Sequence, residues 1–195
     1  MKRRWVAAAA ALTVATAGSA FALLAPGTSQ AAVLPNGFRS VGYMPSWAGS
    51  ATGIQYAKLT HINYSFALPN ANGTLQPIEN TAKLQQLVSL AHQNNVKVSL
   101  AIGGWNGGND SGFEQLAANA GARTTFVNSI MNTVRQYNLD GIDIDWEYPD
   151  PGTSGNNFTA LMTQLGSALH NEGKLHELGA VAGRDRRELA GQRDL

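Results

Sequence analysis

Three carboxylic acids, Asp143, Asp145 and Glu147, occupy every second position of the apolar segment 140–149. This period of two is typical of a β-strand, in which alternate side chains point to opposite faces. The three acids therefore share one face at spacings of roughly 6.5 to 7 Å. The residues on the other face are apolar: Ile142, Ile144 and Trp146. Repulsion and burial should hold a proton on at least one carboxyl, as general acid catalysis requires, so the segment is predicted to be an active-site strand.

A metal site is the first alternative for this strand, because Asp-x-Asp-x-Glu resembles the start of a calcium-binding loop. Such a loop needs Gly at its sixth position, where this chain has Tyr148. A solvated edge strand is the second alternative, but a solvated face normally carries charges of both signs, and residues 136–173 contain no Lys or Arg. The histidines share no ligand spacing. We therefore expect neither a metal nor a cofactor.

Segment 140–149 resembles the Asp-Gly-x-Asp-x-Asp-Trp-Glu-x-Pro signature of the family 18 glycoside hydrolases, the chitinases. Three other segments are similar to the first three strands of that family and follow in the same order: 41–43, 59–67 and 98–105. The resemblance covers about residues 39–174. It implies a secreted chitinase of bacterial type, endo-acting, that hydrolyses β-1,4 bonds between N-acetylglucosamine units.

Residues 39–173 alternate between strand-like and helix-like patterns, which is typical of parallel βα units. Strands are predicted at 39–44, 60–67, 96–102 and 139–146. Helices with apolar stripes are predicted after the capping residue Asn80, around residues 126–137, and from Thr153 or Ser154 to Gly173. The fold class is therefore α/β, and the resemblance implies a TIM (β/α)8 barrel of which about the first four units are legible.

The resemblance also implies a role for each acid. Glu147 matches the catalytic acid that protonates the glycosidic oxygen. Asp145 matches the residue that orients the substrate's 2-acetamido group, and Asp143 matches the inner carboxyl that shares a proton with Asp145. Tyr43 matches the first-strand tyrosine that supports Asp143. The acetamido oxygen is then the nucleophile, so that chitin or a chitooligosaccharide is cleaved with retention.

The candidates for substrate binding lie where the predicted strands end, which is where parallel barrels hold their chemistry: Tyr43, Trp47, Gly104, Trp105 and Tyr148. A flat aromatic ring suits the apolar face of a pyranose, but Trp47 and Trp105 also fit ordinary core plugs. Gly104 suits either a close backbone approach or an ordinary turn. Trp146 is expected to point towards the helices instead.

Residues 1–31 combine a basic start, an Ala-rich apolar run and a small-x-small site at Ser29-Gln-Ala31, which together predict a secretory signal peptide. A permanent membrane anchor is the alternative, although small and polar residues interrupt the apolar run. Without this segment 11 basic residues stand against 13 acidic ones, and this balance of −2 gives no reason to expect nucleic acid as a partner. Cysteine is absent. We expect an extracellular protein with no stable membrane anchor.

Residues 32–174 are accordingly interpreted as the amino-terminal half of a family 18 catalytic barrel. The composition then changes, because eight of the 21 residues in 175–195 are charged. No fifth strand is expected in this tail. Our hypothesis is that the reading frame is lost near Lys174, and a natural charged tail is the alternative.

Two departures from the family pattern lead to further expectations. The third strand has Ala101 where the family usually has Ser, with Ser99 two residues earlier on the same face, so we expect a thinner hydrogen-bond network around Asp143. A tyrosine and a tryptophan of the family's later strands have no counterpart, so the truncated chain is expected to be inactive. Two other functions stay open: a non-catalytic, lectin-like chitin-binding protein, and an endo-β-N-acetylglucosaminidase acting on glycoproteins.

Overall fold

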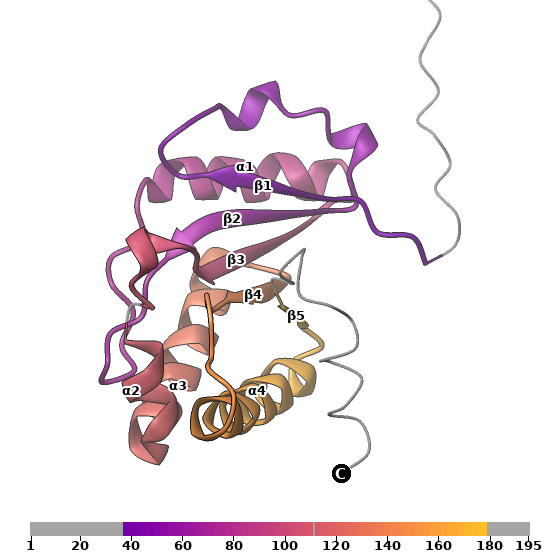
Figure 1. Ribbon diagram of the computed structural model, residues 1–195. Coiled ribbons are helices and arrows are strands. Elements are labelled where there is room, and N and C mark those ends of the chain that lie inside the picture. The colour runs from indigo at the N-terminus through magenta and orange to yellow at the C-terminus, as the bar shows by residue number, and fades with distance from the viewer. Residues whose placement is uncertain (1–36, 111, 179–195) are drawn as a thin grey trace, which may run out of the picture. The chain divides into compact units, whose positions relative to one another are not determined.

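A five-stranded parallel sheet carries the acidic strand, and its strands follow the order of the chain. This computed structural model describes residues 37–110 and 112–178 (Figure 1). The strands are β1 Val41–Pro45, β2 His61–Ala67, β3 Lys97–Gly103, β4 Gly141–Asp145 and β5 Leu175–Leu178. The α-helices are α1 Thr81–Gln93, α2 Phe113–Ala118, α3 Ala120–Tyr137 and α4 Thr153–Asn171. Short 3-10 turns are η1 Ala51–Gly53, η2 Tyr56–Lys58 and η3 Asn106–Gly108.

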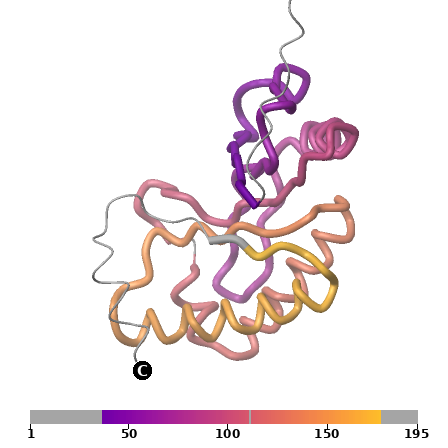
Figure 2. Tube along the Cα trace, turned by 90° about the vertical axis from the view of Figure 1, so that its right-hand side faces the viewer, coloured from indigo at the N-terminus to yellow at the C-terminus, as the bar shows by residue number. Residues whose placement is uncertain are grey.

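The two faces of the sheet differ in chemistry because successive strand residues alternate between them. On the open face, Tyr43 lies beside Asn63, Asn63 beside Ser99, and Ala101 beside Asp143. The other face is apolar and is covered by helices; its buried members include Ile62, Tyr64, Val98, Leu100, Ile102, Ile142 and Ile144. Helix α1 contacts β3, and α4 contacts β5. In both views α4 lies alongside the edge of the sheet that carries β5 (Figures 1 and 2). Parallel strands covered by helices on one face form the wall of a (β/α) barrel, which confirms the predicted fold class.

The helices confirm the predicted apolar stripes. Helix α1 begins where Asn80 caps it, because the Asn80 side-chain oxygen accepts the backbone N–H of Lys83 at 3.3 Å. Helix α4 begins at Thr153 as predicted but ends at Asn171, before Gly173. Helix α2 was not predicted, because six residues are too few to show a helical period. Within 37–110 and 112–178, no helix is both long enough and apolar enough to cross a bilayer.

Strand β5 corrects the predicted end of the barrel pattern. Leu175 lies beside Gly141 and pairs in parallel with β4. Gly141 permits this approach, because a Cβ there would lie 2.6 Å from the Leu175 carbonyl oxygen. The expectation that no fifth strand follows Lys174 is therefore wrong for residues 175–178, whose four positions carry too little period-two signal to reveal a strand. The predicted signal peptide at 1–31 and residues 179–195 of the tail lie outside the described residues.

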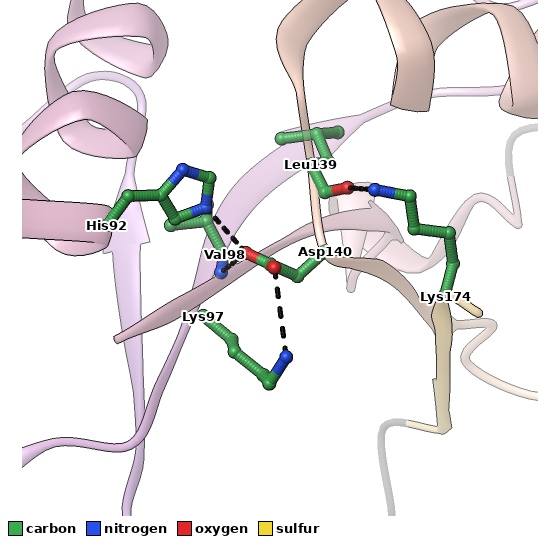
Figure 3. A network of polar contacts seen from close by, with 6 residues as sticks. All are labelled: His92, Lys97, Val98, Leu139, Asp140 and Lys174. Atoms are coloured by element: carbon green, nitrogen blue, oxygen red, sulfur yellow. Dashed lines mark hydrogen bonds and ion pairs between the residues drawn. The ribbon is translucent and has the colours of Figure 1, made fainter. Parts of the chain in front are cut away.

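A polar network fixes the amino end of β4 (Figure 3). Asp140 Oδ2 accepts the backbone N–H of Val98 at 2.8 Å and lies 2.7 Å from Nε2 of His92. The remaining contacts drawn are Lys97 Nζ to Asp140 Oδ1 at 3.9 Å and Lys174 Nζ to the Leu139 carbonyl at 2.8 Å. Asp140 thus joins the last turn of α1, the start of β3 and the start of β4. Asp140, the first acid of segment 140–149, is therefore a structural residue at the amino end of β4, and Glu147 follows the opposite end.

Replacing Asp140 should therefore cost stability. Asp140→Ala removes an acceptor that serves a backbone N–H and a histidine ring, and we expect the free energy of unfolding to fall by about 2 to 3 kcal/mol. Urea-induced unfolding at one fixed protein concentration measures this loss. Asp150→Ala is the matched control, because Asp150 is exposed and its replacement should change stability by less than about 0.5 kcal/mol. Equal effects of the two substitutions would contradict the structural role of Asp140.

Candidate active site

Asp143 is the buried centre of the site, with only 1% of its surface exposed. Its Oδ2 accepts the hydroxyl of Tyr43 at 2.5 Å and the Nδ2 amide of Asn63 at 2.9 Å. Burial raises the pKa of Asp143, while these two hydrogen bonds act in the opposite direction. Burial and the bond to Asp143 also raise the pKa of the Tyr43 hydroxyl, which therefore stays protonated and continues to donate.

The contact between Asn63 and Asp143 reaches across β3, which lies between β2 and β4. The β3 residues on that face are Ser99 and Ala101, both small, so their side chains leave room for the contact. Ala101 is the β3 residue beside Asp143, so β3 offers no serine hydroxyl at that position, as expected. Asn63 from β2 supplies a donor in its place. Asn63 was not predicted as a site residue, although a polar residue on the inward face of an otherwise apolar strand was an available signal.

Asp145 lies two residues further along β4 on the same face and is partly exposed. Burial raises the pKa of Asp145 to about 6, and the charges of Glu147 and Asp143 add to this effect. Burial and repulsion thus act on Asp145 in the predicted direction, because its carboxyl keeps a proton to a higher pH than a free aspartate. Because Asp143 and Asp145 are near neighbours, the proton belongs to the pair.

Glu147 follows the end of β4, and its neighbour Trp146 is fixed in the helix layer. The Trp146 ring stacks on Phe113 of α2, with centroids 5.1 Å apart and planes 9° apart, and meets Phe158 of α4 edge-on at 5.9 Å. Trp146 thus points into the helix layer, as predicted. The charge of Glu147 raises the pKa of Asp145, so these two carboxyl groups lie near each other.

Four aromatic side chains near the carboxyl ends of the strands are exposed: Trp47 at 64%, Trp105 at 61%, Tyr43 at 51% and Tyr148 at 40%. The core-plug interpretation is therefore wrong for Trp47 and Trp105. Trp47 has one ring neighbour, Phe66, at 6.3 Å between centroids and 27° between planes. Contact between these exposed rings and sugar stays a prediction.

Gly104 is a site of close approach. Its φ is +84°, a conformation that favours glycine, and a Cβ there would lie 2.9 Å from the Phe66 ring. Its N–H donates to the carbonyl of Asp145 at 2.7 Å. An ordinary turn would not need this clearance, so the close-approach interpretation is the better one, and the approaching group is the protein itself.

Two buried polar atoms on the open face have no hydrogen-bond partner among the described residues, Oδ1 of Asn63 and Oγ of Ser99. The two residues are direct neighbours on β2 and β3. Across the part of the chain that the structure describes, no group of three or more His, Cys, Asp or Glu side chains is arranged to hold a metal ion. The chemistry that this face offers is therefore that of its carboxyls, hydroxyls and amide.

Comparison with known proteins finds relatives that are named as chitinases. Chitinase A1 of Niallia circulans is 31% identical, covering 83% of this chain and 30% of its own length. Chitinase 1 of Aphanocladium album is 32% identical, covering 86% and 44%. The crystal structure of Ostrinia furnacalis Group IV chitinase in complex with allosamidin has a TM-score of 0.66 at 26% identity, covering 73% of this chain and 44% of that one. The chain spans less than half the length of these proteins.

These relatives come from a bacterium, a fungus and an insect, so the similarity does not select a bacterial type. The model of the family described as glycosyl hydrolases family 18 matches residues 39–191. The predicted resemblance ended near residue 174, so the matched region extends further into the charged tail than expected. The match includes every acid and aromatic residue of the site described above. The chain belongs to glycosyl hydrolase family 18.

Proposed function

We propose that this chain supplies the catalytic strand of a secreted chitinase that hydrolyses β-1,4 bonds between N-acetylglucosamine units. The observation that carries the proposal is the arrangement at the carboxyl end of β4, where Asp143 and Asp145 lie on the strand and Glu147 follows it. Tyr43 and Asn63 both donate to Asp143. Relatives named as chitinases, and one solved in complex with allosamidin, support this substrate class.

Glu147 acts as the general acid in this proposal. It lies beyond the end of β4, where a bound sugar can approach the open face, and it donates its proton to the glycosidic oxygen as the bond breaks. The carbonyl oxygen of the substrate's own 2-acetamido group attacks the anomeric carbon, so no enzyme carboxylate has to form a bond to the sugar. Water then opens the resulting ring, and the configuration is retained.

Asp145 orients the acetamido group, and Asp143 adjusts the charge of Asp145. Both donors to Asp143 use Oδ2, so a proton on Asp143 belongs on Oδ1. Moving the shared proton between the two aspartates then changes which of them is charged without breaking either bond to Oδ2. In its charged state Asp145 can accept a hydrogen bond from the acetamido N–H, and in its protonated state it holds the proton that it shares with Asp143.

Trp47, Trp105 and Tyr148 are proposed to bind the sugar chain. Their exposed rings lie after β1, β3 and β4, and each offers a flat apolar surface to a pyranose. A row of such platforms suits an extended polysaccharide, so chitin or a chitooligosaccharide is the proposed partner. Residues 1–31 are proposed to direct the protein out of the cell.

The raised pKa of Asp145 makes stability depend on pH. The pKa of about 6 in the folded protein lies above the usual aspartate pKa of 3.8, so the folded state holds this proton more tightly than the unfolded chain. The stabilisation is complete below about pH 4 and is lost as the pH rises through about 6. Asp145→Asn should therefore raise the melting temperature at pH 7 by about 2 °C, since the carboxyl is partly exposed, and by less at pH 4.

Melting curves of Asp145→Asn and of the exposed control Asp150→Asn at pH 4 and pH 7 check this expectation. The control should show no such pH dependence. A gain for Asp145→Asn that is larger at pH 4 than at pH 7 would mean that the pKa of Asp145 is lowered, not raised.

Glu147→Gln tests the catalytic proposal. The amide keeps the size and polarity of the side chain but removes the transferable proton, so hydrolysis should fall by at least about 100-fold while chitin binding is kept. Turnover of chitooligosaccharides and binding to chitin are measured in the chain joined to the later strands of a family 18 barrel. Glu172→Gln, at the end of α4, is the control and should keep full activity. Retained turnover in Glu147→Gln would remove Glu147 from the acid role.

Residues 32–195 tested alone are expected to release no product from a chromogenic chitobioside. In the described part of the chain, β1 and β5 each pair with one neighbour, and open parallel edges favour association over a closed barrel. We expect this chain to aggregate or run as an oligomer on a sizing column. A soluble monomer with measurable turnover would contradict the proposal that later strands complete the site.

A further inference from the structure

The loop after β1 is held by one lysine. Lys83 lies in the first turn of α1, and its Nζ donates to the backbone carbonyls of Pro45 at 2.7 Å and Ser46 at 3.4 Å, and also to that of Ala48. An ammonium group has three N–H donors and no acceptor. All three donors are thus satisfied by a single short loop, residues 45–48, which we call the β1 loop.

The position of Lys83 is unfavourable for a helix by itself. The first turn of an α-helix carries the positive end of the helix dipole, where acidic side chains are favoured and cations are not. Lys83 is the third residue of α1, and the first turn of α1 contains no acid. The three carbonyl oxygens of the β1 loop offset this repulsion, so the contact explains a lysine at this position.

A second set of contacts holds the same loop from other directions. The Ser46 hydroxyl donates to Oε2 of Glu79 at 2.6 Å, and the Ser46 backbone N–H donates to the carbonyl of Ser65 on β2 at 2.7 Å. The Tyr64 hydroxyl in turn binds the carbonyls of Glu79 and Asn80, at 3.0 Å each. Ser46 is 3% exposed. The start of α1 and the end of β2 therefore both fix the backbone of the β1 loop.

Trp47 is the large apolar residue of this loop that is exposed, and it lies between two of the carbonyls that bind Lys83. Its ring is 64% exposed and rests on Phe66. Phe66 in turn fills the space that is left by the missing side chain of Gly104, the residue that precedes Trp105. An exposed ring on a mobile loop would lose binding free energy when a ligand ordered it, whereas a ring on a fixed backbone would not.

We propose that Lys83 is a positioning residue for sugar binding, because it fixes the backbone of the β1 loop, which carries the exposed ring of Trp47. The inference rests on the proposed function for the identity of the ligand, an N-acetylglucosamine chain. Its structural part, the anchoring of the loop, does not depend on that function. Lys83 touches no substrate and takes no part in proton transfer.

Hydrogen exchange of the chain tests the anchoring. Lys83→Met keeps the length of the side chain but removes every donor, so the three carbonyls lose their bonds to Lys83, and the Ser46 carbonyl keeps only the Asn80 Nδ2 donor at 3.4 Å. Exchange of the amides in residues 44–50 should accelerate about tenfold or more, while exchange in α3 stays unchanged and shows that the fold is kept. Lys83→Arg should give an intermediate rate, because a planar guanidinium does not match three converging carbonyls.

Lys97→Met is the matched control, since Lys97 lies at the opposite end of the strands and reaches Asp140 only at 3.9 Å. In the Lys97→Met variant, the amides of residues 44–50 should exchange at the same rate as in the wild type. Equal exchange in Lys83→Met and wild type would overturn the anchoring.

Binding of chitotetraose to the same proteins tests the ligand part. Lys83→Met should weaken the affinity about fivefold, Trp47→Ala should weaken it at least as much, and Lys97→Met should leave it unchanged. Unchanged affinity in Lys83→Met, with accelerated loop exchange, would overturn the role in sugar binding. If the wild type binds no chitotetraose, the proposed ligand fails for this chain, and the exchange data alone then decide whether Lys83 anchors the loop.

Discussion

The site depends on one buried carboxyl group that has to be hydrogen-bonded. Asp143 on β4 is 1% exposed and accepts a hydroxyl from β1 and an amide from β2. An unpaired carboxylate at this depth would be costly, so the two donors tie the positions of three strands to one another. A shift of β1 or β2 that broke either bond would also change the protonation of the neighbouring Asp145. The relative positions of β1, β2 and β4 and the protonation of the two aspartates therefore depend on the same hydrogen bonds.

The same strand is held at both ends by contacts of different kinds. At the amino end, Asp140 binds the backbone of β3 and a histidine of α1. At the carboxyl end, Trp146 is packed between Phe113 and Phe158 in the helix layer. Between these anchors β4 has little freedom to slide, and a slip of one residue would move every acid to the helix side. The acids of the open face are thus placed by residues that do no chemistry.

The helix layer also contributes to the open end of the sheet. Helix α2 supplies the ring on which Trp146 stacks, and α1 supplies the lysine that binds the loop carrying Trp47. Gly104 lets Phe66 pack between the ends of β2 and β3. The exposed aromatic surfaces therefore depend on covering elements as much as on the strands they follow. In a barrel, packing of the wall and presentation of the binding surface are linked in this way.

Local periodicity in the sequence was sufficient to predict the first four strands, including the acidic one, and the three long helices with their apolar stripes. It also predicted that Trp146 points towards the helix layer. Each of these features repeats a pattern over several residues. The signature of segment 140–149 was sufficient for the family. Two elements without a repeated pattern, α2 and β5, became visible only in the fold. Asn63 and Lys83 are single residues whose partners lie 80 and about 35 to 38 positions away along the chain. That Asn63 reaches Asp143 and that Lys83 reaches the β1 loop was decided by the tertiary structure, because only strand register and helix packing bring such distant atoms within hydrogen-bonding distance.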